Sequence, residues 1–334
     1  MAAVCSAVAG SVPRESVDRR PGDRPSWHTR HVVVRLIVAV NPTAGSGLAT
    51  GLADAVTARL TAAGHEVTRA VAADGEALER HLRSRVARER PDVVIAVGGD
   101  GMVHLVVNAI ARSSAALGIL PAGSGNDIAR CLGLPVDDSE EAIDRIASAL
   151  EGTEARTRPV DAVRTSTGRW FAGMLSAGFD AAVNERANRM RWPHGRSRYV
   201  LAVLLEVARL TPHRYRITID RDGRQVDAVL VTVGNTTSIG GGMRLTPDAK
   251  VDDGLLDVLV ATPLPRRQLI RLLPKVFTGA HVHDEHVSIE RGRVVTIDVA
   301  DRRAPVPVVY ADGERMGGLP VTLEVVPAAL RVLV

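Results

Sequence analysis

Three apolar runs, each followed directly by a glycine-rich turn, constrain the fold of this chain more than any other feature of its sequence. The runs are Val32–Val40, Val93–Val97 and Leu117–Leu120, and they carry few polar residues. Runs without apolar–polar alternation are typical of strands that are buried on both faces of a parallel sheet. We therefore expect these three segments to be neighbouring strands of one sheet.

Segments with helical spacing separate these strands. Helices are predicted at Leu48–Ala63, which Gly64 ends, and at Glu76–Arg90, which Pro91 ends. Further elements complete the pattern, with a strand at His65–Val71 and helices at Met102–Arg112 and Asp127–Leu132. This alternation predicts a doubly wound α/β nucleotide-binding domain over residues 31–157.

After Thr157 the pattern changes to strands in series, which predicts a mainly antiparallel β-sandwich over residues 158–334. Two segments between the strands, Tyr199–Leu210 and Leu264–Phe277, have helical spacing. Composition leaves open whether the final residues, Leu330–Val334, return to the first domain. The predicted strands are Arg158–Arg164, Arg169–Ala177, Tyr215–Asp220, Val226–Val233, Leu255–Ala261, His286–Glu290, Val294–Val299, Val306–Tyr310 and Val321–Val325.

The first 30 residues predict a disordered tail, because from Ser11 to Arg30 they are rich in Pro, Arg, Asp and Ser without periodicity. The short apolar stretch Ala2–Ala9 follows no basic segment, which argues against a secretion signal. No apolar run reaches the length of a membrane span, since Arg35 interrupts even Val32–Val40. We expect a cytoplasmic protein.

The cysteine content indicates the redox compartment, and the charge and aromatic content limit the classes of binding partner. Cys5 and Cys131 are the only cysteines, which offers no disulfide framework and fits a reducing compartment. Of the 42 basic residues only Lys250 and Lys275 are lysines, and the net charge is +4. Aromatic residues make up only 3% of the chain, so the stacking platforms that bind single-stranded nucleic acid are missing. We expect no nucleic-acid partner.

The three glycine-rich turns are Asn41–Gly47, Gly98–Gly101 and Pro121–Asp127. Turns at the carboxyl ends of parallel strands line one shared crevice, into which helix N-termini direct backbone N–H groups. Glycine permits close approach of the backbone to phosphate oxygens. The alternative is that each glycine only allows a tight strand-to-helix connection. None of the turns matches a Walker or dinucleotide-binding pattern, so a different polyphosphate site is indicated.

Acidic residues accompany two of these turns. The Asp100 carboxylate stands between glycines at a strand end, where it can reach a magnesium ion bound to nucleotide phosphates. Its alternative role is an Asx-turn or a helix cap. Asn126 and Asp127 open a predicted helix, and capping of that helix is their alternative role.

Taken in order, the motifs of this chain resemble the diacylglycerol kinase catalytic family, which includes the sphingosine and ceramide kinases. The resemblance runs from Val32 to the end of the chain. Its motifs are Asn41-Pro42 with Gly45, Gly98-Gly99-Asp100-Gly101 with Asn108, Leu120-Pro121 with Gly123, Ser124, Asn126, Asp127 and Arg130, then Pro247-Asp248-Ala249 running into Asp252–Asp257, and Asp312-Gly313-Glu314.

The resemblance implies an ATP-dependent lipid kinase with Mg²⁺ as cofactor and the nucleotide between the two domains. Asp312 and Glu314 would serve the phosphoryl acceptor, with Glu314 as the base, and Asp100 would be the third catalytic residue. A structural magnesium site would use the carbonyls of Lys250 and Leu255 and the carboxylate of Asp253. The nucleotide contacts implied are Asn41, Pro42, Thr43, Ala44, Gly45, Gly98, Gly99, Asp100, Gly101, Met102, Val103, His104, Gly123, Ser124, Asn126 and Asp127.

Simpler interpretations of the two later motifs remain open. Asp312-Gly313-Glu314 also has the sequence of a hairpin turn, and Asp252-Asp253-Gly254 that of a plain turn without a metal.

This chain also departs from the family pattern. Met102 replaces a common threonine, Leu105 a common glutamate and Ala109 a common glycine, and Val71 stands near a strand end that is often threonine. Ser124 in place of threonine keeps the hydroxyl group. The departures bear on the details of nucleotide contact.

The acceptor that the resemblance implies is a lipid hydroxyl, with conversion of diacylglycerol to phosphatidic acid as the leading hypothesis. One alternative is a kinase of nicotinamide dinucleotides, which shares the Gly-Gly-Asp-Gly turn. The other is a non-catalytic nucleotide or lipid sensor, which the changes at Met102 and Leu105 favour.

A basic, partly aromatic stretch suggests peripheral contact with anionic headgroups at the inner face of the membrane. The alternative is a solvated helix and loop. Whether the chain forms a homodimer is left open. The stretch contains Arg186, Arg189, Arg191, Arg196 and Arg198, with Trp192 and Tyr199 among them.

Overall fold

The computed structural model describes residues 32–42, 48–72, 74–152, 154–190, 192, 201–203, 205–206, 211–301 and 306–334. In this part of the chain no helix has the length and apolar character needed to cross a bilayer. The predicted tail at residues 1–30 and most of the predicted helix at Tyr199–Leu210 lie outside the described residues.

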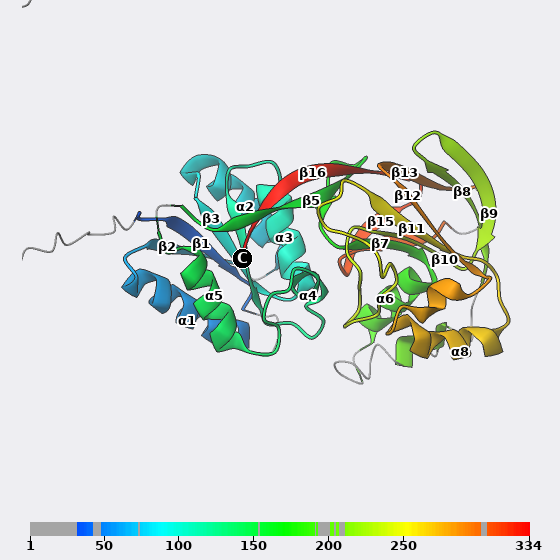
Figure 1. The fold of residues 1–334 in the computed structure, drawn as a ribbon, viewed down its shortest axis with the longest axis horizontal. Helices are drawn as coiled ribbons and strands as arrows, with labels where there is room; N and C mark the ends of the chain where they lie inside the picture. The colour runs from blue at the N-terminus through cyan, green and yellow to red at the C-terminus, as the bar shows by residue number, and fades with distance from the viewer. Residues whose placement is uncertain are drawn as a thin grey trace, which may run out of the picture.

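Strands and helices alternate in the first domain, which consists of β1 (Arg35–Val40), α1 (Leu48–Ala62), β2 (Glu66–Val71), α2 (Gly75–Glu89), β3 (Val93–Gly98), α3 (Asp100–Ile110), β4 (Ala116–Pro121), α4 (Asp127–Cys131) and α5 (Ser139–Ala149). The strands form a parallel sheet in the order β2-β1-β3-β4. Buried residues of α1 and α5 pack on one face of this sheet, and those of α2 and α3 pack on the other (Figure 1). The predicted doubly wound α/β domain is confirmed.

The central strands of this sheet are buried throughout, as their apolar sequences require. Every residue of β3 and of β4 is buried, and so is every residue of β1 except Arg35. Helix α2 lies within one residue of its predicted bounds, because it begins after Asp74, whose carboxylate accepts a hydrogen bond from the Ala77 N–H at 2.7 Å, and stops before Pro91. Helix α3 begins and ends two residues earlier than predicted. Burial on both faces thus fixes the register of the strand ends that carry the turns.

The second domain is built mainly from antiparallel strands: β5 (Thr157–Thr165), β6 (Trp170–Phe171), β7 (Met174–Gly178), α6 (Phe179–Arg189), β8 (His213–Ile219), β9 (Asp222–Ala228), β10 (Leu230–Gly234), β11 (Leu256–Ala261), α8 (Arg266–Val276), the 3₁₀ helix η2 (Ala280–His283), β12 (Val287–Gly292), β13 (Val294–Val299), β14 (Val308–Ala311), β15 (Glu314–Gly318) and β16 (Val321–Leu333). One sheet has the order β12-β11-β10-β7-β14-β15. It packs against β16, β13 and β8, joined by β5 and β6, around a shared apolar core. The predicted β-sandwich is confirmed.

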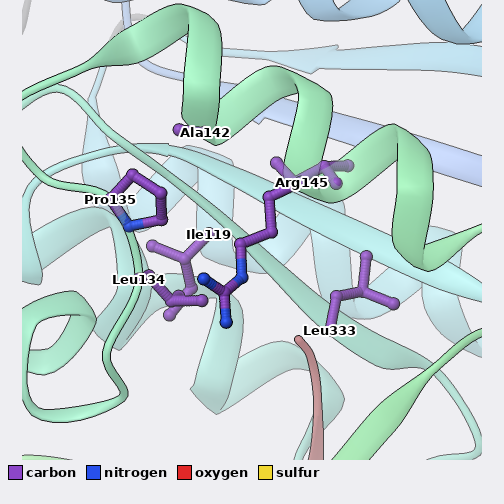
Figure 2. A pocket seen from close by; sticks show the side chains of 7 residues that line it. Ile119, Leu134, Pro135, Ala142, Arg145 and Leu333 are labelled. Atoms are coloured by element: carbon purple, nitrogen blue, oxygen red, sulfur yellow. The ribbon is translucent and has the colours of Figure 1, made fainter.

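The last strand joins the two domains. β16 pairs along β5 and β13 in the second domain, and its far end pairs in parallel with β4, where Val332 lies opposite Leu117. Figure 1 shows this strand, in red, returning to the first domain. Figure 2 shows Leu333 close to Ile119 and Arg145, where only a gap of about 10 Å³ remains. One continuous sheet therefore crosses both domains.

Two of the predicted strands are wrong as single elements. Val226–Val233 divides at Val229 into β9 and β10, which belong to different sheets. Arg169–Ala177 divides into β6 and β7, because the N–H groups of Ala172 and Gly173 donate to the Asp312 carboxylate instead of continuing a ladder. Helix α6 and strand β15 are elements that the sequence patterns above do not predict.

Candidate active site at the domain interface

The glycine-rich turns gather at one edge of the parallel sheet. Val40 lies opposite Val97, and Gly98 lies opposite Pro121, so β1, β3 and β4 end side by side. Asn41 and Pro42 directly follow β1, whereas Thr43, Ala44 and Gly45 lie outside the described residues. The shared crevice expected at the carboxyl ends of the strands is therefore lined by at least two complete turns and the start of a third.

Two of these turns touch through their backbones. A Cβ atom added at Gly123 would lie 2.5 Å from the Gly99 Cα, and one added at Gly99 would lie 3.1 Å from the Gly123 Cα. Any side chain at Gly123 would thus force the turns apart. These glycines are required for the approach of one turn to the other, and they leave backbone rather than side chains facing the crevice.

The Asn126 side chain closes the Pro121–Asp127 turn on itself. Its backbone is left-handed, with φ of 55°, and its side chain both accepts from the Gly123 N–H and donates to the Gly123 carbonyl, each at 2.9 Å. Asn126 is buried, so its amide shapes the turn and is not available to a ligand. In contrast, Ser124 in the same turn is exposed.

Asp100 connects the second turn to the third. Its two carboxylate oxygens accept the N–H groups of Asp127 and Ile128 at 3.1 and 3.0 Å, so it satisfies the start of α4. Burial is the main cause that raises the pKa of Asp100 to about 6, and the negative charges of Asp127 and Asp312 add to it against the lowering effect of the two backbone hydrogen bonds. A carboxyl group crowded by two other carboxylates is electrostatically suited to a cation.

Asp127 holds the second domain against this turn. Its carboxylate accepts hydrogen bonds from the N–H groups of Gly241 and Gly242, at 2.6 and 2.8 Å. These glycines belong to the loop between β10 and β11, more than a hundred residues away in the sequence. Asp127 thus makes a contact that spans the domain boundary.

Asp312, in the second domain, also accepts hydrogen bonds from backbone N–H groups. Its backbone is left-handed, with φ of 52°, and its buried carboxylate accepts the N–H groups of Ala172, Gly173 and Met174 at 3.0–3.2 Å. With its oxygens occupied, Asp312 holds the turn between β14 and β15 in place and does not face the crevice as a free carboxylate.

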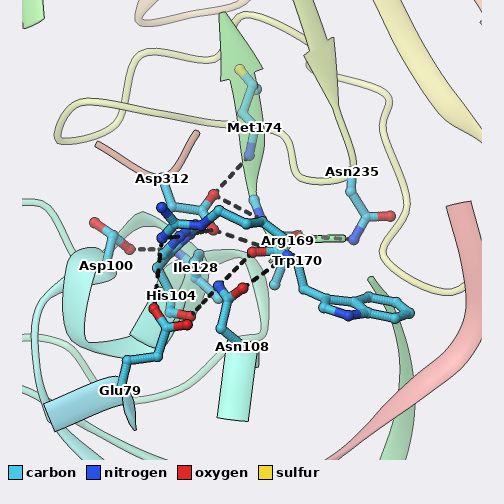
Figure 3. A network of polar contacts seen from close by, with 12 residues as sticks. Glu79, Asp100, His104, Asn108, Ile128, Arg169, Trp170, Met174, Asn235 and Asp312 are labelled. Atoms are coloured by element: carbon cyan, nitrogen blue, oxygen red, sulfur yellow. Dashed lines mark hydrogen bonds and ion pairs between the residues drawn. The ribbon is translucent and has the colours of Figure 1, made fainter. Parts of the chain in front are cut away.

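His104 links Asp312 to the first domain (Figure 3). The imidazole of His104 is fully buried on α3, with Nδ1 3.4 Å from Asp312 Oδ2 and Nε2 3.3 Å from an Arg169 Nη. Because arginine can only donate, Nε2 accepts and the proton of a neutral ring resides on Nδ1, directed at Asp312. Arg169 also lies 3.6 Å from the Glu79 carboxylate, which completes a chain of charges across the interface.

Asn108, one turn further along α3, makes a second contact between this helix and the second domain. Its amide accepts from the Trp170 N–H at 2.9 Å and donates to the Trp170 carbonyl at 2.7 Å, so the first residue of β6 pairs with a side chain of the helix. Arg169 and Trp170 are not among the site residues predicted from the sequence.

Glu314 is the exposed acidic residue of the site. It is the first residue of β15, and its Oε1 lies only 2.8 Å from the position that a Cβ atom at Gly101 would occupy. The carboxylate of the second domain therefore meets the first turn of α3 in the first domain. The side chains of Met102, Val103 and His104 are buried in the interior, so only their backbones are available to a ligand.

The predicted structural magnesium loop has hydrogen bonds of its own. The Asp253 carboxylate accepts the Leu255 N–H at 3.0 Å, and Gly254 donates to the buried carboxylate of Asp161 at 2.7 Å. Burial raises the pKa of nearby Asp257, whose Oδ2 has no hydrogen-bond partner in the described part of the chain. One carboxylate with the Lys250 and Leu255 carbonyls makes an all-oxygen donor set of the kind that Mg²⁺ accepts. Among the described residues no cluster of three or more His, Cys, Asp and Glu side chains has metal-binding geometry.

One functional segment went unpredicted although the sequence carries a signal for it. Gly240, Gly241 and Gly242 form an uninterrupted run, and all three have positive φ angles between 66° and 101°. Such a run indicates backbone that approaches another group closely, which here is Asp127. Nothing comparable marks Arg169, since it is one of many arginines in the chain.

Comparisons with known proteins show which family this chain is similar to. Residues 35–163 match the model of the diacylglycerol kinase catalytic domain, and residues 173–334 match the YegS C-terminal NAD kinase beta sandwich-like domain. A diacylglycerol kinase from Mycobacterium tuberculosis (strain ATCC 25618 / H37Rv) is 39% identical over 305 residues, covering 91% of this chain and 96% of the relative.

More distant relatives also match this chain over most of its length. A diacylglycerol kinase from Bacillus subtilis (strain 168) is 28% identical over 86% of this chain and 91% of its own length. A crystal structure of a diacylglycerol kinase from Bacillus anthracis str. Sterne superposes with a TM-score of 0.66 at 21% identity, covering 90% of this chain and 96% of the other, which shows the shared fold.

Gly123→Ala tests the contact between the turns. We expect it to lower the free energy of unfolding by about 1–3 kcal/mol, because the added methyl group collides with the Gly99 backbone. The matched control is Gly51→Ala on α1, where nothing lies within 4 Å of the added atom and a gain of up to about 1 kcal/mol is expected. Urea unfolding of both variants makes the comparison, and equal stability of the two would contradict the close approach.

The raised pKa of Asp100 predicts a pH dependence of stability in metal-free buffer. The folded carboxyl binds its proton more tightly than the unfolded one, so unfolding releases protons between about pH 4 and pH 6 and the free energy of unfolding falls as the pH rises through that window. Asp100→Asn removes this dependence. Unfolding curves with a chelator should therefore show the wild type losing stability relative to the variant as the pH rises. A difference that stays constant, or that grows in the opposite direction, would refute the assignment.

Proposed function

This chain belongs to the diacylglycerol kinase family, and from that premise we propose that it transfers the γ-phosphoryl group of ATP to the hydroxyl of diacylglycerol, giving phosphatidic acid. The observation that supports this best is the position of Glu314, an exposed carboxylate of the second domain that meets the first turn of α3 beside two glycine turns. A nucleotide and an acceptor bound on opposite sides of this contact would bring their reacting groups together.

The nucleotide phosphates are proposed to bind at the start of α3 and at the Pro121–Asp127 turn. The first N–H groups of a helix have no intrahelical acceptor, and within the described chain no side chain caps α3 after Gly99. Gly123 and the Ser124 hydroxyl are exposed beside them. Asn41, at the end of β1, is proposed to contact the same nucleotide.

Asp100 is the residue best suited to hold a magnesium ion at these phosphates. Each of its oxygens accepts one backbone hydrogen bond and keeps a second lone pair. Burial is the main cause of its raised pKa, and a divalent cation would offset the smaller contribution from the charges of Asp127 and Asp312. The ion, when bound, would neutralise charge that develops on the phosphate oxygens.

Glu314 is proposed to accept the proton of the attacking hydroxyl. It is exposed, and no hydrogen bond within the described residues occupies its carboxylate. Asp312, two residues earlier, fixes the turn from which Glu314 projects, through its three backbone hydrogen bonds and its contact with His104. We assign proton transfer to Glu314 and positioning to Asp312.

A lipid acceptor is supported by an apolar cavity in the second domain. The cavity has a volume of about 60 Å³ and lies between α8 and the sheet face that carries Leu230, Leu259 and Ala261. His281 in its wall lies with Nε2 3.1 Å from the Leu245 carbonyl oxygen, and burial lowers the pKa of this imidazole. The lining residues are Phe179, Val229, Leu230, Leu245, Leu259, Ala261, Leu264, Leu269, Leu272, Val276, His281, His286 and Val287.

The cavity and the catalytic turn lie at opposite ends of one strand. Met174, at the start of β7, donates to Asp312, whereas Phe179, just after the end of β7, lines the cavity. Five residues of β-strand span about 17 Å, so an elongated amphiphile could place its hydroxyl at Glu314 and its apolar part in the cavity. A compact dinucleotide would leave the cavity unused.

Glu314→Gln tests the proposed base. We expect kcat for phosphate transfer to diacylglycerol to fall about 100-fold or more, since the amide cannot accept the proton, and Asp100→Asn to cause a similar loss. The matched control is Glu285→Gln, an exposed glutamate in the same domain, which should leave kcat unchanged. Labelled ATP with magnesium and a panel of diacylglycerol, sphingosine and NAD provides the assay. Transfer to NAD alone, or to none of the three despite tight ATP binding, would contradict the proposal.

Ala261→Leu tests the cavity as the site of the acyl chain. The larger side chain occupies part of the cavity, so we expect KM for a long-chain diacylglycerol to rise about tenfold, with a smaller effect on a short-chain one. Ala62→Leu, at an exposed position near the end of α1, is the matched control. An equal effect on both chain lengths would separate the cavity from acceptor binding.

A further inference from the structure

Helix α8 covers the apolar cavity with one face and presents an unusual second face to solvent. Leu269, Leu272 and Val276 line the cavity at three- and four-residue spacing, which is the inner face of the helix. Figure 1 shows α8 on the outer surface of the second domain, far from the first domain. Its outer face has no partner among the described residues.

Apolar side chains form a ridge on that outer face. Ile270 is 54% exposed and Phe277 is 55% exposed, and both rank among the large hydrophobic residues left open to solvent. Pro274 is exposed between them. Spacings of four and three residues place all three on one line along the helix. An exposed ridge of this kind is costly in water and indicates a binding surface.

Cationic side chains form a second ridge directly beside the first. Arg267, Arg271 and Lys275 follow one another at four-residue spacing, and all three are exposed. The helix contains no acidic residue, and none of its basic side chains has an ion-pair partner within the described residues. The next acidic residues along the chain are Asp284 and Glu285, beyond η2.

We propose that the outer face of α8 docks on an anionic lipid bilayer, with Ile270 and Phe277 inserted into its surface and Arg267, Arg271 and Lys275 bound to its headgroups. A helix with adjacent apolar and basic ridges fits an interface between hydrocarbon and negatively charged headgroups. The charge of this face favours a bilayer of anionic lipids as its partner. Three cations lie beside an apolar ridge, and no carboxylate of the described residues compensates their charge.

The basic stretch singled out in the sequence fits a bilayer less well. Arg186 forms an ion pair with Glu206, and Arg189 forms one with Glu185, so the charges of both are already compensated. Arg191, Arg196 and Arg198 lie outside the described residues. Of the described cations considered for this contact, those of α8 are therefore the ones without an ion-pair partner.

This docking gives the cavity a direct supply of lipid, an implication that rests on the proposed function. The inner face of α8 forms one wall of the cavity, so a bilayer against the outer face lies one helix away from the acyl chain site. A lipid would enter along the edge of α8 without crossing water.

Binding to vesicles of phosphatidylglycerol and phosphatidylcholine in equal parts, measured by sedimentation, tests the surface. We expect Arg267→Glu with Arg271→Glu to lower the partition coefficient at least about tenfold, since each basic residue near an anionic surface contributes a severalfold gain. Ile270→Ser with Phe277→Ser should lower it by a similar factor. The matched control is Arg80→Glu with Arg88→Glu on α2, an equal change of charge, which should have little effect. Wild-type binding should be lost on vesicles of phosphatidylcholine alone and weaken with salt.

Three results would overturn the inference: no binding of the wild type, equal losses in the α2 control, or unchanged binding of the α8 variants. Analytical ultracentrifugation tests the alternative that the ridge binds a second copy of the chain. A concentration-dependent dimer of the wild type that is lost in Ile270→Ser with Phe277→Ser would assign the ridge to that contact instead. Kinase activity toward diacylglycerol in neutral detergent micelles should be unchanged in the α8 variants. Absence of that activity in the wild type would refute the proposed function while the vesicle result still decides the role of α8.

Discussion

Buried carboxylates that accept backbone N–H groups hold the two domains of this chain in a single arrangement. Asp127 of the first domain binds Gly241 and Gly242 of the second, and Asp312 of the second binds a turn of its own domain and His104 of the first. A buried carboxylate without partners would be very costly, whereas each hydrogen bond to a charged group contributes about 1.5–3 kcal/mol. Few relative positions of the domains satisfy all these oxygens at once.

The chemistry of the site follows from this arrangement. Asp312 fixes the hairpin from which Glu314 projects, and Asp127 fixes the turn that lies against Gly99. Four features thereby meet at one edge of the parallel sheet. They are the exposed carboxylate of Glu314, the partly buried carboxyl group of Asp100 with its raised pKa, and two backbone turns. Acids in different surroundings can take different roles, so Asp100 suits a metal ion and Glu314 suits a proton.

Sequence patterns predict the features of this structure that depend on neighbouring residues in the chain. Buried apolar runs and helical spacing give both domains their fold class, and the position of each glycine turn after a strand predicts the shared edge of the sheet. Contacts between distant segments escape such reasoning. Asp312 divides a predicted strand by taking the N–H groups of Ala172 and Gly173, and the residues that Asp127 binds are visible only as a run of glycines. The resemblance assigns His104 to the nucleotide, whereas its buried ring contacts Asp312.

In the arrangement proposed for this chain, a nucleotide bound at the start of α3 presents its terminal phosphate to Glu314. A crystal structure with a non-hydrolysable ATP analogue and magnesium tests this directly. We expect phosphate oxygens at the α3 N-terminus and at Ser124, with the metal on Asp100 and the Glu314 carboxylate facing the γ-phosphorus. A nucleotide bound elsewhere, or a Glu314 side chain directed away from its last phosphate, would contradict the proposed arrangement.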